Sequence, residues 1–137
     1  MIKLESQHFK KNEAGFTLLE LLIVVAIIGI LAVISLIQLA VYKQHSFDAM
    51  AETDLRNAIS AEEAAYVDEK DYVSCADAAE CETNLPGFVA SKNSTGANEM
   101  ETFQFTAEAD SFTATAKHSK GATTFTYNSA VGSIQKS

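Results

Sequence analysis

Residues 21–42 read LLIVVAIIGILAVISLIQLAVY and contain no charged side chain. As an α-helix this stretch would extend about 33 Å at roughly 1.5 Å per residue, and the hydrocarbon core of a bilayer is about 30 Å thick. A secretory signal has a shorter apolar region, of about 7–15 residues, followed by a small-residue cleavage site. The rest of the chain is too small to surround a core helix of this kind. The stretch therefore predicts a membrane helix that is retained.

The charges on either side of this stretch differ in sign. Three lysines precede it, whereas three of the 18 Asp and Glu residues lie before residue 42 and the other 15 lie after it. The cations are Lys3, Lys10 and Lys11, and the early acids are Glu5, Glu13 and Glu20. Because cationic flanks stay in the cytoplasm, we expect a cytoplasmic N-terminus and an exported remainder. The exported part is too acidic to favour nucleic acid as a partner.

A helical period continues beyond the apolar stretch. Apolar residues recur at spacings of three and four, at Phe47, Ala51, Leu55, Ala58, Ile59 and Tyr66. The pattern predicts an amphipathic helix with one buried stripe, continuous with the apolar stretch as a single helix of about fifty residues. The charged residues between these positions include Asp54, and we expect the acidic pair Glu62-Glu63 to lie on a solvated helix face rather than in a metal site.

The pattern changes after Tyr72. Residues 75–87 and 91–98 are predicted loops, and from Thr102 onward apolar and polar side chains alternate with period two. Alternation over residues 102–107, 112–116 and 124–127 predicts a three-stranded antiparallel meander with one aromatic face. The aromatic face of the meander must be buried by another element, and the apolar stripe of the helix must pack against an apolar surface. We therefore expect the two to pack together. The predicted fold class is α+β, with a long N-terminal helix, half membrane-spanning and half amphipathic, packed on a small antiparallel β-meander.

Two cysteines, Cys75 and Cys81, lie on the exported side. An even pair in an oxidising compartment predicts a disulfide, with two free thiols as the alternative. The spacing is not Cys-x-x-Cys, so a redox-active pair is not expected.

The chain carries no common enzyme signature. G-x-S-x-G, H-E-x-x-H and a phosphate-binding glycine loop are all missing from the sequence, and its three histidines are scattered. The sequence therefore predicts no catalytic residue, no metal site and no cofactor, and we do not expect an enzyme.

The segment Gly15-Phe16-Thr17-Leu18-Leu19-Glu20, with the apolar stretch that follows it, resembles the class III signal of type IV pilins and the related pseudopilins. The resemblance extends from Gly15 to about Gln38. It implies cleavage between Gly15 and Phe16 by a prepilin peptidase, and N-methylation of Phe16 by the same enzyme. It also implies a lollipop-shaped subunit with a leader at residues 1–15, a transmembrane or filament-core helix at 16–42 and a globular domain at 43–137.

Glu20 is the one charged side chain in residues 16–42. A charge within a membrane helix is costly unless it is paired or functional, and cleavage would create a cationic amine on Phe16. We expect the Glu20 carboxylate to pair with the Phe16 amine of a neighbouring subunit and thereby set the register of assembly. Pilins of this kind usually carry a proline where this chain has Ile37, which leaves open how far the helix unravels in a filament.

The predicted function is the structural subunit of a type IV pilus, assembled as a homopolymer through the N-terminal helix. The resemblance implies two further partners, the prepilin peptidase and the inner-membrane assembly machinery, with an inner-membrane location before assembly and an extracellular one afterwards. A type II secretion pseudopilin or a minor pilin is an alternative, although residues 111–137 hold no Asp or Glu for the calcium loop of a major pseudopilin. A membrane-anchored periplasmic binding module that never polymerises is the alternative of another class. Motility, adhesion, DNA uptake and electron transfer all stay open as roles of the filament.

Overall fold

The computed structural model describes residues 15–137, so the predicted leader lies outside the described residues except for Gly15. The elements follow in the order α1 (Leu18–Glu69), α2 (Ala78–Asn84), β1 (Met100–Ala107), β2 (Phe112–His118), β3 (Phe125–Asn128) and β4 (Ser133–Lys136). The chain divides into two units between Gln38 and Leu39.

Helix α1 is 52 residues long, which confirms the single helix expected from the sequence. It is long and apolar enough to cross a membrane by length and composition. Its apolar side chains between Leu21 and Val41 are exposed in the isolated chain. The helix ends at Glu69, and Lys70 follows with a positive φ of 63°. This left-handed residue lets the backbone leave the helix axis.

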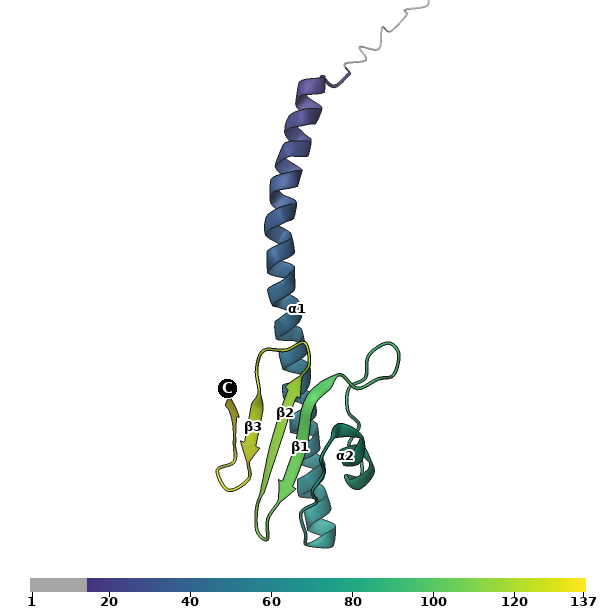
Figure 1. Cartoon of the computed structure of the whole chain (residues 1–137), viewed down its shortest axis with the longest axis vertical. Coiled ribbons are helices and arrows are strands. Elements are labelled where there is room, and N and C mark those ends of the chain that lie inside the picture. The colour runs from purple at the N-terminus through teal and green to yellow at the C-terminus, as the bar shows by residue number, and fades with distance from the viewer. Residues whose placement is uncertain (1–14) are drawn as a thin grey trace, which may run out of the picture. The chain divides into compact units, whose positions relative to one another are not determined.

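The strands form one antiparallel sheet in the order β1-β2-β3-β4, and Figure 1 shows the second half of α1 lying against it. The register pairs Phe105 with Ala114 and Ala116 with Phe125. The three predicted strands are confirmed, but the prediction missed β4. That strand is only four residues long, and it has no fully buried position to give an alternating pattern.

The segment 75–87 is predicted to be a loop, but it contains helix α2. Asp77 caps this helix, and its side chain accepts hydrogen bonds from the backbone N–H groups of Ala79 at 2.9 Å and Glu80 at 2.8 Å. Side-chain acceptors at this position satisfy donors that a short helix would otherwise leave unpaired. At seven residues the helix is too short to show a helical period in the sequence.

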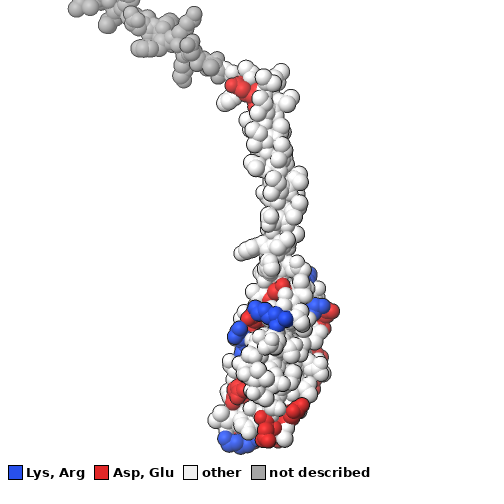
Figure 2. Space-filling model, turned by 90° about the vertical axis from the view of Figure 1, so that its left-hand side faces the viewer, with Lys and Arg blue, Asp and Glu red and all other residues white. Residues whose placement is uncertain are grey.

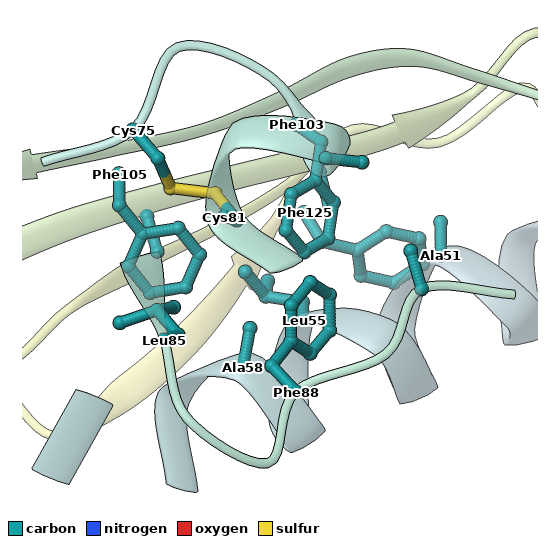
Figure 3. Close-up of a cluster of buried hydrophobic side chains, with 14 of the residues drawn as sticks. Ala51, Leu55, Ala58, Cys75, Cys81, Leu85, Phe88, Phe103, Phe105 and Phe125 are labelled. Atoms are coloured by element: carbon teal, nitrogen blue, oxygen red, sulfur yellow. A yellow bond between two sulfur atoms is a disulfide. The ribbon is translucent and has the colours of Figure 1, made fainter. Parts of the chain in front are cut away.

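The core lies between α1, α2 and the sheet, as Figure 3 shows. Ala51, Leu55 and Ala58 of α1 face the aromatic side of the sheet, which confirms the predicted stripe. The buried aromatic residues are Phe88, Phe103, Phe105, Phe112 and Phe125. Each fully buried phenylalanine contributes about 1.5–3 kcal/mol relative to an exposed one, so this cluster stabilises the second unit.

Two acidic residues of α1 are buried, and for Glu62 this corrects the solvated helix face that we expected. Asp54 is 1% exposed and Glu62 is 0% exposed. Asp54 accepts hydrogen bonds from Ser91, and Glu62 accepts one from the backbone N–H of Val73. Segments from later in the chain therefore cover this side of α1 and supply donors that the helix itself does not have.

Candidate processing and assembly site

Helix α1 begins with a reciprocal capping arrangement between Thr17 and Glu20. The backbone N–H of Thr17 donates to Glu20 Oε2 at 2.8 Å, and the Glu20 N–H donates to Thr17 Oγ1 at 3.2 Å. The Thr17 hydroxyl donates to Glu20 Oε2 at 2.9 Å. This capping box satisfies backbone donors that a helix start leaves free. It also places a carboxylate where the helix dipole favours negative charge.

Gly15 and Phe16 precede the helix and are not part of any regular element. The Phe16 side chain is 91% exposed. A Cβ atom added at Gly15 would meet no atom of residues 15–137 within 4 Å. The described part of the fold therefore does not require glycine at position 15. The peptide bond between Gly15 and Phe16 joins two exposed residues without regular secondary structure.

The surface of the helix beyond Glu20 is apolar. Its exposed side chains are leucine, isoleucine and valine over several turns, and Figure 2 shows the charged residues gathered elsewhere, chiefly on the second unit. An apolar surface of this extent marks a contact with lipid or with other helices. The predicted site residues Gly15, Phe16 and Glu20 thus lie together in one short segment directly before this surface.

Sequence reasoning missed Thr17. The pattern Thr-x-x-Glu ahead of an apolar run is itself a capping-box signature, so the residues needed to find it were present in the sequence. The structure shows that Glu20 has a partner within its own chain. Both hydrogen bonds from Thr17 go to Oε2, and Oε1 accepts none from the described residues.

Cys75 and Cys81 form the predicted disulfide, with a Cα–Cα distance of 5.2 Å. The backbone of Cys75 also pairs with Phe105 of β1, through hydrogen bonds of 3.1 and 2.8 Å. The bridge therefore ties α2 to the edge of the sheet. Both cysteines are buried, which suits a structural bond rather than exchange with an external thiol.

Within residues 15–137 no group of three His, Cys, Asp or Glu side chains could hold a metal ion. His118 is buried, stacks on Phe47 with ring centroids 4.6 Å apart, and accepts the Lys120 N–H at Nδ1. Such contacts are typical of a packed core residue.

Comparison with known proteins places this chain near one family. The model of the prokaryotic N-terminal methylation motif matches residues 10–36. A type IV wide pilus major component, PilA4 of Thermus thermophilus, is 38% identical over 64 residues, which cover 47% of this chain and 49% of that protein. The chain thus spans about half the length of the curated relative that it matches.

Proposed function

We propose that this chain is a type IV pilin and a structural subunit of a pilus filament, a proposal that the methylation motif and the similarity to a pilus component support. The observation that carries this proposal is the exposed apolar half of α1, with the Gly15–Phe16 junction and Glu20 directly before it. The subunit is anchored in the membrane by this helix before assembly and is extracellular in the pilus. Its role is structural rather than enzymatic.

Processing prepares the helix for assembly. A prepilin peptidase cuts between Gly15 and Phe16 and methylates the new terminus, so that a cationic amine appears four residues before Glu20. The α-amino group has a reference pKa of about 7.7–8.0, and the amine is therefore charged at neutral pH. Because the Thr17 bonds go to Oε2, Glu20 Oε1 is left to receive an amine from a neighbouring subunit.

Assembly exchanges lipid for protein around the helix. The apolar side chains between Leu21 and Val41 cannot stay in water once the subunit leaves the bilayer. They are covered when the helices of many subunits pack together as the filament core. The inner-membrane pilus assembly machinery and the peptidase are the further partners that this route requires.

A major subunit is favoured over the alternatives by two observations. The matched relative is described as a major component of its pilus, and residues 111–137 contain no acidic side chain for the calcium loop of a major pseudopilin. A minor pilin would share the same N-terminal segment. A membrane-anchored binding module would share the helix but would never enter a filament.

The test is mass analysis of filaments sheared from the cell surface. We expect this chain to be abundant in them and to begin at an N-methylated Phe16. A low ratio to another pilin would assign it as a minor subunit. Its complete absence from filaments, with the processed chain confined to the inner membrane, would contradict the proposal and favour the anchored binding module.

A further inference from the structure

Glu62 is a buried carboxylic acid with only one hydrogen-bonded oxygen. It lies on α1 two turns before the helix ends and is 0% exposed. Its Oε1 accepts the backbone N–H of Val73, whereas its Oε2 is buried and has no hydrogen-bond partner within residues 15–137. Buried polar atoms without partners are uncommon and call for an explanation.

The hydrogen bond holds the segment that follows the helix, residues 70–76, which we call the helix-exit segment. After the left-handed Lys70, the chain turns back along α1. The Tyr72 ring stacks on Tyr66 of α1 at 4.3 Å and lies against Phe112 of β2 at 4.9 Å. The segment then joins the sheet edge at Cys75. Glu62 thus holds the helix-exit segment, which connects α1 to the disulfide-closed residues 75–81, against the helix.

The surroundings of Glu62 favour its neutral form. The titratable groups that act on it or on the adjoining Tyr72 are few: Glu63 of α1 and Tyr72 of the helix-exit segment lie near Glu62, and Tyr66 of α1 and Tyr127 of β3 lie near Tyr72. None of these groups is a cation, and none of the ion pairs in the described part of the chain includes Glu62. Burial raises the pKa of the Glu62 carboxyl, and the Glu63 charge adds to the rise, while the Val73 N–H opposes it.

We propose that Glu62 is a protonation-controlled latch, which holds the helix-exit segment against α1 while it is neutral and releases the segment as it ionises. When neutral, its Oε1 still accepts the Val73 N–H and the site contains no charge. When ionised, it places a charge in a buried site where the Val73 N–H is its one hydrogen-bond donor among the described residues, and the cost of desolvation disfavours the closed state. Opening the segment would let water reach the carboxylate.

The sign of the pH dependence follows from linkage. In the open segment Glu62 has the ordinary glutamate pKa of about 4.3, and in the closed segment its pKa is higher. Between these two values the closed state binds more protons than the open state. The closed state is therefore most stable at pH values below the ordinary glutamate pKa. Its stability is progressively lost as the pH rises through the raised pKa of Glu62 in the closed segment.

Glu82, which is part-buried, supplies an internal control. It also holds a later backbone donor, because its Oε1 accepts the Ala90 N–H at 2.9 Å. Unlike Glu62, it has a cation beside it, and the Lys92 hydrogen bond lowers the pKa of Glu82. The contribution of ionised Glu82 to stability is therefore fully present at pH values above the ordinary glutamate pKa. That contribution should not change between about pH 5 and pH 8.

Amide hydrogen exchange on the processed full chain in detergent micelles tests the latch. After correction for intrinsic exchange, we expect protection at Val73 to fall as pH rises above about 4.3, by at most about tenfold per pH unit. Protection at Ala90 should stay level. In Glu62→Gln the fall at Val73 should disappear, and in Glu63→Gln it should persist. Equal pH profiles at Val73 in the wild type and Glu62→Gln would overturn the proposal.

A carbon-13 NMR titration of the wild-type Glu62 side chain tests the latch independently, and it remains possible if Glu62→Gln does not fold. The Glu62 carboxyl carbon should titrate above the ordinary glutamate range, together with the change in Val73 protection. A Glu62 carboxyl that titrates at or below that range would rule out the latch.

Discussion

Asp54 on α1 accepts two hydrogen bonds from Ser91, a residue 37 positions later in the chain. The Ser91 N–H donates to Oδ2 at 2.8 Å, and the Ser91 hydroxyl donates to Oδ1 at 2.8 Å. Both oxygens of this buried carboxylate are therefore satisfied by one residue of the loop that follows Ala90. Asp54 therefore holds that loop against the helix. Because its side chain is buried, it is not part of the charged surface.

Replacement of Asp54 should destabilise the second unit. Asp54→Ala removes both acceptors and leaves the part-buried Ser91 N–H unpaired, at a cost of about 1–3 kcal/mol in the free energy of unfolding. Asp54→Asn keeps one carbonyl oxygen and should lose less. Urea unfolding of the full chain in micelles measures the difference, and an unchanged midpoint in Asp54→Ala would contradict the role given to Ser91.

The burial of Asp54 and Glu62 could not be predicted from the sequence. Periodicity along α1 identified Ala51, Leu55 and Ala58 correctly, because apolar spacing reflects a property of the helix alone. Whether an acidic side chain on the flank of that stripe is exposed depends on segments that arrive later, such as Ser91 and Val73. No local pattern near residues 54 or 62 contains that information.

The N-terminal segment was more fully predictable from the sequence. The apolar half of α1 follows from a continuous pattern in the sequence, because a membrane imposes length and polarity on each residue in order. The processing junction and the assembly role of Glu20, which the resemblance to type IV pilins implies, stay predictions. Strand β4 and helix α2 were missed for the opposite reason. Each is short, and each is held by contacts with distant segments rather than by its own period.

Gly121 is confined by Asp48. A Cβ atom at Gly121 would overlap Asp48 Oδ1, which accepts the N–H groups of Ala122 at 2.9 Å and Thr123 at 3.0 Å. We expect Gly121→Ala to displace this carboxylate and to lower the free energy of unfolding by about 1–3 kcal/mol, as overpacking usually does. In the Asp48→Ala background the same substitution should cost much less. A double-mutant cycle with additive effects would exclude the steric coupling.

The disulfide should contribute modestly to stability. Replacing Cys75 and Cys81 with serine should lower the free energy of unfolding by about 2–3 kcal/mol, since the closed loop is short. Folding should persist, because the Cys75–Phe105 backbone pairing does not need the sulfur atoms. Alkylation followed by mass analysis without reductant should find no reactive thiol in native filaments, and two labelled cysteines would refute the bond there.

Processing should depend on the small size of residue 15. Because a Cβ at Gly15 meets no atom within 4 Å among residues 15–137, we expect any effect of substitution to arise in the peptidase rather than in folding. Gly15→Ala should be partly cleaved and Gly15→Val should accumulate with its leader attached. N-terminal mass analysis of membrane fractions distinguishes the two. Normal cleavage of Gly15→Val would show that the peptidase does not select for glycine here.

The two roles of Glu20 can be separated by a pair of variants. Glutamine also serves as the last residue of a capping box, so Glu20→Gln should keep the Thr17 contacts and the helix start while removing the charge. Thr17→Val does the reverse, because it removes the hydroxyl at a cost of about 1 kcal/mol in helix stability and keeps the carboxylate. The two variants therefore test ion pairing and capping independently.

In the filament core, Glu20→Gln would leave the Phe16 amine of a neighbour without its counter-charge. Breaking one member of a buried ion pair typically costs about 3–5 kcal/mol, which is repeated at each subunit contact. We expect Glu20→Gln to be processed and inserted in the membrane but scarce in sheared filaments, whereas Thr17→Val should still assemble. Abundant filaments of Glu20→Gln, or a loss of filaments confined to Thr17→Val, would mean that the capping box and not the charge pair determines assembly.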